Sequence, residues 1–304
     1  MISVVVPCYG SPGSIYPLYQ KIREVCETHN FIYEVILVND ACPKGSWGEI
    51  EKLAKEVDAV KGVNLSRNFG QHSAITCGLS FAKGETIIIM DCDLQDDPKY
   101  IPDLMSKMGE GYQVVQARRI LRNERWLKRI QSRVFYASLS FFLGVDLDYT
   151  VANYGAYSKK VTDNILKMGD RMRFFPYLVA WLGFKSTQIN VIQQVRHEGR
   201  SNYTLGKSLS LALDIAVSSS GRPLYICAGF GAFTSCLTFF LGIVYALRYY
   251  LVGTAPSGWT TIIVCLLFST GVIMLNMGIV GLYLIKVFEQ TKRRPLYVVD
   301  EHIN

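Results

Sequence analysis

The stretch TIIIMDCDLQDDP, residues 86–98, indicates both the fold class and the position of the expected site in this 304-residue chain. Its apolar first half predicts a buried strand, and Asp91 and Asp93 follow directly at the end of that strand. Two carboxylates one residue apart supply hard oxygen ligands, which suit a Mg²⁺ or Mn²⁺ ion that also binds the phosphates of a nucleotide. The alternative is a solvated acidic turn, in which Asp96 and Asp97 cap the helix that follows.

Strand-like and helix-like segments alternate on both sides of this stretch. We expect strands at 3–8, 33–38, 60–65, 85–90 and 112–117, and helices at 15–26, 47–57, 71–82 and 98–108. Such alternation predicts an α/β fold with a mainly parallel, Rossmann-like sheet and helices on both of its faces. Ligands of such sheets bind beyond the carboxyl ends of the strands. The residues that follow predicted strands, and define the expected site, are Tyr9, Asp40, Arg67 and Asp91.

Two long apolar runs near the end of the chain predict a transmembrane hairpin. Residues 224–247 and 262–285 each hold about 24 residues without Asp, Glu, Lys or Arg, enough to cross a bilayer as a tilted helix. A pair of buried core helices is the alternative. The expected parts are an α/β domain at 1–204, a juxtamembrane amphipathic helix at 205–222, two transmembrane helices within 223–288 at about 224–250 and 260–287, and a tail at 289–304.

Charges beside the apolar runs orient the protein in the membrane. Arg222 precedes the first run, and the cations at 292–294 follow the second. By the positive-inside rule both flanks face the cytoplasm, so we expect an integral, multi-pass protein of the bacterial inner membrane with a cytoplasmic N-terminal domain and tail. Arg248 runs against this rule and has to snorkel outward. Met1 leads directly into strand-like residues, and we expect no signal peptide.

Composition narrows the function classes. The net charge of +7 suits an anionic membrane surface or phosphorylated substrates. We expect no nucleic-acid partner, because the chain has two membrane runs and no basic repeat interleaved with aromatic residues. The eight cysteines form no C-x-x-C pair and have no histidine partners at zinc spacing, so we expect reduced, buried thiols.

An amphipathic segment at about 124–143 predicts a helix at the membrane interface. It combines Lys128, Arg129 and Arg133 with a run of apolar and aromatic side chains. Helices of this composition lie in the plane of the interface, with their apolar face toward the acyl chains. An ordinary surface helix packed on the sheet is the alternative.

Five motifs occur in the order VVVPCY at 4–9, LVND at 37–40, SRNFG at 66–70, MDCDLQDDP at 90–98 and RHEGRS at 196–201. Together they resemble the polyprenyl-phosphate glycosyltransferases of glycosyltransferase family 2, the group of dolichyl-phosphate-mannose synthase and the bacterial polyprenyl-phosphate glucosyltransferases. The resemblance extends over nearly the whole chain, including RRPLYV at 293–298. It implies a GT-A fold, a cytoplasmic catalytic domain and an inverting sugar transfer from a nucleotide sugar to a polyprenyl phosphate.

The resemblance implies a set of nucleotide-binding residues, namely Pro7, Tyr9, Asp40, Arg67 and Asp91. The first three are expected to hold the base and ribose. A carboxylate accepts hydrogen bonds from a ribose, and an aromatic ring beside a turn can face a base. Three of these residues also have a simpler alternative role. Tyr9 can be an aromatic that packs in the turn, Asp40 a helix N-cap and Arg67 a surface arginine.

The resemblance also implies that Asp91, Asp93 and Gln95 hold the Mg²⁺ or Mn²⁺ ion, with Asp93 as a catalytic residue. A cation there neutralises the departing diphosphate, which is a Lewis-acid role.

The acceptor phosphate calls for arginines, because a guanidinium binds oxyanions through parallel donors. The candidates are Arg119, Arg129, Arg133 and Arg196, with Ser201 as a hydroxyl donor. Of these, Arg119 and Arg196 match the family positions best. Contact with lipid headgroups is an equally suitable role for Arg129 and Arg133, since both lie in the segment expected at the membrane interface.

The chain departs from the family at Asn153, in ANYGA at 152–156, where many members carry an acidic residue. An amide cannot act as a base. A phosphate monoester, whose second pKa is about 6, is already mostly dianionic at neutral pH and needs only alignment with the anomeric carbon. We therefore expect Asn153 to orient the sugar or the acceptor as a second catalytic residue. Asn39 and Gly10 stand where family members often have Asp and Asn, which leaves the identity of the nucleotide-sugar donor open.

The expected function is transfer from a UDP-sugar, preferred over a GDP-sugar, to an undecaprenyl-type phosphate, as in the synthesis of cell-envelope polysaccharide. One alternative is a catalytically silent nucleotide-sugar or lipid-binding partner, which Asn153 keeps open. The other is a processive polysaccharide synthase, which needs more spans and a Gln-x-x-Arg-Trp-like motif. Small-residue faces at Gly229, Gly231 and Gly242, or at Gly271, Gly278 and Gly281, offer contacts with membrane neighbours or a homo-oligomer.

Overall fold

The computed structural model describes residues 1–120, 126–148, 150–192, 214–215, 217–218, 220–252 and 258–304. Arg196 and Ser201 lie outside the described residues, as does most of the expected juxtamembrane helix at 205–222. The chain divides into two compact units, one of Met1–Ser208 with Arg294–Asn304 and one of Leu209–Arg293.

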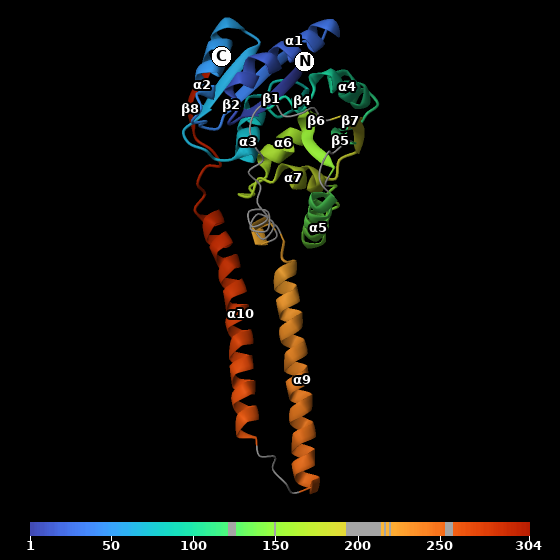
Figure 1. The fold of residues 1–304 in the computed structure, drawn as a ribbon, viewed down its shortest axis with the longest axis vertical. Helices are drawn as coiled ribbons and strands as arrows, with labels where there is room; N and C mark the ends of the chain where they lie inside the picture. The colour runs from blue at the N-terminus through green and yellow to red at the C-terminus, as the bar shows by residue number, and fades with distance from the viewer. Residues whose placement is uncertain (121–125, 149, 193–213, 216, 219, 253–257) are drawn as a thin grey trace. The chain divides into compact units, whose positions relative to one another are not determined.

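The described residues of the first unit form an eight-stranded sheet in the order β7-β5-β6-β4-β1-β2-β3-β8 (Figure 1). The strands are β1 (Ile2–Cys8), β2 (Tyr33–Asn39), β3 (Val60–Leu65), β4 (Thr86–Ile89), β5 (Val114–Arg119), β6 (Val151–Ser158), β7 (Ser186–Val191) and β8 (Val299–Ile303). β6 runs antiparallel to β4 and β5, and β8 runs antiparallel to β3. The other neighbouring strands pair in parallel, which confirms the mainly parallel sheet.

Helices cover both faces of this sheet. Those that pack against the strands are α1 (Ile15–Thr28), α2 (Ser46–Glu56), α3 (Gln71–Phe81), α4 (Ile101–Gly109) and α6 (Lys159–Lys167). The unit also contains α5 (Trp126–Leu143), α7 (Phe175–Leu182) and the short 3₁₀ turns η1 (Pro12–Ser14) and η2 (Pro98–Tyr100). On one face, Ile15, Leu18 and Ile22 of α1 join the core with Val4 and Val6 of β1. These side chains follow the periods of a helix and a strand, so burial of one apolar face holds both elements in place.

The opposite face carries α3, which lies close to the sheet at Gly78. A Cβ atom at Gly78 would overlap Val5 of β1 and press on Val38 of β2. Glycine is therefore required for the approach of this helix to the two central strands. The close packing matters for the site, because α3 begins at the carboxyl edge of the sheet with Gln71.

β6, β7 and β8 lie beyond the last strand predicted from the sequence. In β6, Gly155 sits where a Cβ would lie 2.5 Å from the Val115 carbonyl oxygen, so the strand carries a residue of poor strand propensity for steric reasons. β8 reads VDEHI and is an edge strand. Charged residues are common on edge strands because they prevent further pairing, and they hide the apolar alternation that identifies a strand.

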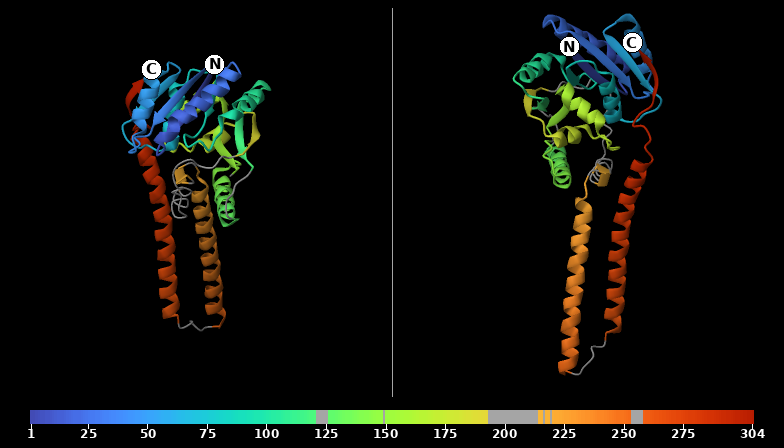
Figure 2. Two further views of the ribbon diagram at one scale, coloured as in Figure 1. Left: turned by 45° about the horizontal axis from the view of Figure 1, so that its top comes forward. Right: turned by 180° about the vertical axis from the view of Figure 1, so that it is seen from behind.

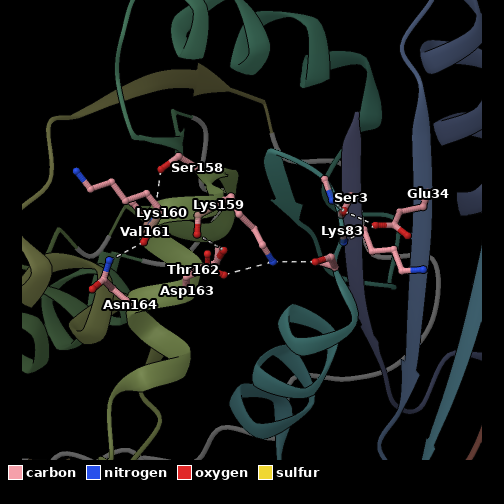
Figure 3. Close-up of polar contacts among 12 residues, drawn as sticks. Ser3, Glu34, Lys83, Ser158, Lys159, Lys160, Val161, Thr162, Asp163 and Asn164 are labelled. Atoms are coloured by element: carbon pink, nitrogen blue, oxygen red, sulfur yellow. Dashed lines mark hydrogen bonds and ion pairs between the residues drawn. The ribbon is translucent and has the colours of Figure 1, made fainter.

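A buried polar network closes the amino-terminal edge of the sheet, opposite the expected site (Figure 3). Glu34 accepts hydrogen bonds from Ser3 Oγ at 2.6 Å, Lys61 Nζ at 2.6 Å and the Lys83 amide at 2.7 Å. Burial acts to raise the pKa of Glu34, but these three donors outweigh it and lower the pKa. Lys159 Nζ donates to the Ala82 carbonyl at 2.9 Å in the same region. The network fixes the loops that enter the strands.

The second unit contains two long helices, α9 (Arg222–Val252) and α10 (Trp259–Thr291), which run side by side (Figures 1 and 2). Segments of 30 residues, Arg222–Leu251 and Ile262–Thr291, are long and apolar enough to cross a membrane. Their apolar windows are not buried among the described residues, so the structure does not support the alternative of core helices. Tyr283 Oη donates to the Ser220 carbonyl at 2.7 Å and ties α10 to the start of α9.

Candidate active site

Four adjacent strand ends form the candidate site. β4, β1, β2 and β3 are neighbours that pair in parallel, so their carboxyl ends lie at one edge of the sheet. The side chains that follow these ends are Tyr9, Asp40, Arg67 and Asp91, which the structure brings to the same edge. The Tyr9 ring is 52% exposed there, as a side chain that meets a ligand has to be. Pro7 lies inside β1 and pairs with Val38.

Asp40 is buried and holds the loop that follows β3. Its two carboxylate oxygens accept hydrogen bonds from the amides of Phe69 at 2.7 Å and Gly70 at 2.9 Å. Burial raises the pKa of Asp40 in spite of these two donors. The role of helix N-cap is wrong, because α2 begins at Ser46 with Gly45 as its N-cap. Asp40 therefore holds the loop of residues 66–70 in place, and its predicted contact with a nucleotide stays a prediction.

The same loop carries Arg67 on its exposed side. The guanidinium carbon of Arg67 lies 4.8 Å from the ring centroid of Phe69, a cation–π contact. Because the Phe69 amide is bound to Asp40, this contact links the arginine to the buried carboxylate through one residue. Arg67 is thus a structured, solvent-facing cation at the site edge.

Hydrogen bonds to Cys42 and Lys44 hold the turn after β1. The Gly10 amide donates to Cys42 Sγ at 3.1 Å, and Lys44 Nζ donates to the Gly10 carbonyl at 3.1 Å. Burial acts to raise the pKa of the Cys42 thiol, but hydrogen bonds led by that from Ser46 lower it. The expectation of buried thiols is confirmed for Cys42, Cys8, Cys26, Cys77 and Cys92, but it is wrong for Cys236 and Cys265, which are exposed on the two long apolar helices. The contact of Cys42 with Gly10 could not be predicted, since the two residues meet only through the pairing of β1 with β2.

Hydrogen bonds also order the acidic loop that contains Asp91 and Asp93. Gln71 Nε2 donates to Asp91 Oδ1 at 2.6 Å, and the Gln95 amide donates to Asp93 Oδ1 at 3.1 Å. Leu94, between them, has a positive φ of 62° and is buried. A left-handed conformation at a branched residue is unfavourable, so the packing around Leu94 stabilises this turn.

The two remaining acids of the loop have different roles. Asp97 is the N-cap of η2 and accepts a hydrogen bond from the Lys99 amide at 3.1 Å, which confirms half of the capping alternative. Asp96 is not a cap. It is 4% exposed, accepts from the Asp91 amide at 3.2 Å and lies 3.3 Å from Arg119 Nη2. Burial raises the pKa of Asp96, against the opposing effect of Arg119.

β6 brings Asn153 to the level of the acidic loop. In the antiparallel register of β4 and β6, Ile89 faces Gly155, so Asp91 and Asn153 lie two residues further on in the same direction. Tyr154 Oη donates to the Asp97 carbonyl at 2.9 Å and fixes the strand to the loop. Asn153 therefore belongs to the part of β6 that continues past the end of β4 toward the acidic loop.

The five residues predicted to hold the acceptor phosphate lie in three parts of the chain. Arg119 ends β5, whose carboxyl end lies at the same edge as that of β4, and the structure brings it to the acidic loop through Asp96. Arg133 is exposed on α5, and Arg129 belongs to the same helix, although its side chain lies outside the described part. Arg196 and Ser201 lie outside the described residues. The structure thus brings one of the five to the site.

The chemistry of the side chains fits a cation that takes some of its ligands from the protein and the others from a substrate. Among the described residues, no group of three or more His, Cys, Asp or Glu side chains could hold a metal ion alone. Asp91 and Asp93 supply two hard carboxylates in a partly exposed loop. Mg²⁺ typically binds through one or two carboxylates and completes its shell with phosphate oxygens and water. The pair therefore suits a metal–diphosphate complex.

Comparison with known proteins agrees with this arrangement. The family described as Glycosyl transferase family 2 matches residues 3–166. An undecaprenyl-phosphate 4-deoxy-4-formamido-L-arabinose transferase of Aeromonas hydrophila is 30% identical over 304 residues, 99% of this chain and 93% of that protein. A prophage bactoprenol glucosyl transferase homolog of Escherichia coli (strain K12) is 30% identical over 299 residues, 98% of each chain.

A solved structure shares the fold of the first unit. Glucosyl-3-phosphoglycerate synthase from Mycobacterium tuberculosis, in complex with Mn²⁺, UDP and glucosyl-3-phosphoglycerate, aligns with a TM-score of 0.50 at 19% identity. The alignment covers 73% of this chain and 80% of that one. At this identity the likeness concerns the fold, and it agrees with the α/β sheet described above.

Proposed function

The chain belongs to glycosyltransferase family 2, and on that premise we propose that it transfers a sugar from a nucleotide sugar to a polyprenyl phosphate at a membrane. The names of two relatives support a polyprenyl phosphate as the acceptor. Both align over nearly their whole length, and their names specify undecaprenyl phosphate and bactoprenol. Two helices long enough to cross a membrane support a substrate that resides there.

For the donor we propose a UDP-sugar bound at the carboxyl edge of β1, β2 and β4. Tyr9 and the turn around Gly10 face the base and ribose, while Asp40 holds the loop of residues 66–70 against them. Asp91 and Asp93, with Gln95, would hold a Mg²⁺ or Mn²⁺ ion. The positive charge of the ion would offset the negative charge of the departing diphosphate. This donor assignment is supported by the convergence of these residues at one edge.

The reaction we propose is a single displacement with inversion. An oxygen of the lipid phosphate forms a bond to the anomeric carbon while the bond from that carbon to the nucleoside diphosphate breaks, and its electron pair leaves with the diphosphate. No proton transfer is required, because a phosphate monoester is mostly dianionic at neutral pH. Asn153, level with Asp91, is suited to orient the sugar or the phosphate for this displacement.

Arginine side chains are proposed to hold the acceptor phosphate. Arg119 lies at the edge of the acidic loop, and the sequence motif at 196–201 supplies Arg196 and Ser201. On α5, Arg133, Val134 and Phe141 are exposed, an arrangement that suits either the phosphate or the membrane interface. The charges at 222 and 292–294 support a cytoplasmic site, with α9 and α10 crossing the bilayer twice.

The single observation that carries this proposal is the position of Tyr9, Asp40 and Asp91 at one edge of the sheet, in a chain with two apolar helices of membrane-spanning length. The test uses the full chain in detergent with Mn²⁺, short polyprenyl phosphates and a panel of radiolabelled UDP-sugars and GDP-sugars. Label from one donor should become extractable into organic solvent only when polyprenyl phosphate is present. Label that stays in a water-soluble polymer, or no transfer from any donor, would contradict the proposal.

A further inference from the structure

Gln71 connects the loop of residues 66–70 to the paired carboxylates Asp91 and Asp93. It is the first residue of α3, and its Nε2 lies 2.6 Å from Asp91 Oδ1. The Gln71 side chain is exposed, so burial of apolar surface does not enforce this contact. The distance is that of a hydrogen bond, and a hydrogen bond from an amide to an ionised carboxylate is a strong one.

The residues before Gln71 are held just as firmly. The Phe69 and Gly70 amides donate to the two oxygens of Asp40. Asp40 follows β2 and Asp91 follows β4, and β1 lies between these strands in the sheet. Residues 69–71 therefore cross the carboxyl end of β1 and join the carboxylates on its two sides. At its other end the loop is fixed by the Ser66 amide, which donates to the Val298 carbonyl at 3.0 Å.

We propose that Gln71 is a positioning residue for Asp91, which holds one oxygen of this carboxylate so that the other faces the divalent cation of the donor complex. The proposal rests on the proposed function for the identity of that complex. This role would also connect the two ends of the donor site. Asp40, at the nucleoside end, binds the Gly70 amide, and the next residue, Gln71, holds the Asp91 carboxylate at the diphosphate end.

The choice of side chain supports this role. A neutral amide donor restricts the rotation of Asp91 and does not itself neutralise the negative charge of the carboxylate. A lysine or arginine at the same place would compete with the metal for that charge. Partners that orient metal ligands in this way typically change metal affinity or activity by about 10- to 100-fold when they are removed.

The experiment compares the full-length protein with Gln71→Ala and Gln71→Met. Methionine keeps the length of the side chain but donates no hydrogen bond, so it separates orientation from packing. Binding of Mn²⁺ in the presence of UDP is measured by electron paramagnetic resonance, and the Mn²⁺ concentration for half-maximal sugar transfer is measured in parallel. Gln20→Ala, on α1, is the matched control.

We expect both Gln71 variants to bind Mn²⁺ about 10-fold more weakly in the UDP complex, with Gln20→Ala unchanged. The melting temperature without metal should fall only by the small amount expected for the loss of one exposed hydrogen bond. A Gln71→Met protein that binds Mn²⁺ as tightly as the wild type would overturn the proposal, and so would a wild type that binds no Mn²⁺ with UDP. Weaker Mn²⁺ binding by the variants, in a protein that transfers no sugar, would support the role of Gln71 and contradict the proposed function.

Discussion

Arg119 and Asp96 form an ion pair inside the site, with Arg119 Nη2 3.3 Å from Asp96 Oδ1. The other oxygen of Asp96 accepts the amide of Asp91 at 3.2 Å. One buried carboxylate therefore joins the arginine expected at the acceptor phosphate to the backbone of the acidic loop. Arg119 Nε is buried without a hydrogen-bond partner in the described part of the chain, where the guanidinium is held by its Nη2 hydrogen bond to Asp96.

Replacing Asp96 should destabilise the first unit strongly. Asp96→Ala leaves Arg119, whose side chain is 16% exposed, as an uncompensated buried charge, and we expect a loss of about 3–5 kcal/mol of unfolding free energy. The control is Glu27→Ala, which breaks the pair with Arg23 at 2.7 Å, where the two side chains are 56% and 49% exposed. That loss should be far smaller, because an exposed ion pair contributes little to stability. Denaturant titration measures both, and equal losses would contradict the buried role of Asp96.

Removing the paired carboxylates should abolish transfer without unfolding the protein. The double change of Asp91 and Asp93 to alanine removes a charge effect worth several kcal/mol of barrier, so we expect a rate at least about 100-fold lower. Each residue lies in a partly exposed loop and accepts hydrogen bonds, so the stability loss should be about 1–2 kcal/mol. Rate and melting temperature are measured on the same sample. Transfer at the wild-type rate would refute the metal role.

Asn153 should affect the turnover number more than folding. Asn153→Ala removes the amide proposed to orient a substrate, and loss of a hydrogen bond of about 0.5–1.5 kcal/mol corresponds to a kcat about 2- to 10-fold lower. Asn190→Ala, at an exposed position of β7, is the matched control and should leave kcat unchanged. Steady-state kinetics with the identified donor measures the effect. Full activity of Asn153→Ala would show that this amide does not orient the substrates.

His72 should make the protein less stable in mild acid. Burial lowers the pKa of His72 to about 4, whereas a histidine in an unfolded chain titrates near pH 6.5. The unfolded state therefore binds more protons between these values, and the contribution of His72 to stability is lost as pH falls from about 6.5 to 4. The Phe175 amide donates to His72 Nδ1 at 3.5 Å, which also requires the neutral ring.

The change His72→Gln keeps an acceptor for the Phe175 amide but does not titrate in this range. We expect its melting temperature to depend less on pH than that of the wild type between pH 6.5 and pH 4. Thermal melting in a pH series provides the measurement. Parallel curves for the two proteins would show that protonation of His72 does not contribute to acid sensitivity.

The last residues of the chain should stabilise the first unit through α3. Tyr297 Oη and Ser80 Oγ lie 3.0 Å apart, and a double-mutant cycle of Tyr297→Phe and Ser80→Ala isolates this hydrogen bond. We expect a coupling of about 0.5–1.5 kcal/mol. Ser106→Ala, on an exposed site of α4, should show no coupling to Tyr297→Phe. Additive losses for Tyr297 and Ser80 would rule out the contact.

Local sequence patterns were sufficient for the first half of the fold. β1 to β5 and α1 to α4 begin and end within a few residues of the expected bounds, because each shows the period of its own secondary structure. β6 and β8 were missed for physical reasons. Gly155 and Asn153 interrupt the apolar pattern of β6, and β8 shows the charges of an edge strand.

The candidate site divides in the same way. The sequence placed Tyr9, Arg67 and Asp91 after strands, and the parallel sheet brought them to one edge. It could not predict the contacts of Asp40 with Phe69 and Gly70, which are separated by 29 and 30 residues. Such contacts depend on the order of the strands, and no local signal specifies it.

By itself, the sequence determined the α/β class, the apolar helices and the acidic pair, because burial of apolar periods and the charge of carboxylates are local properties. The tertiary structure alone decided that Asp96 binds Arg119 rather than capping a helix and that Gln71 holds Asp91. These choices depend on which strand ends lie next to each other. Strand order follows from the packing of the whole core, to which distant residues contribute together.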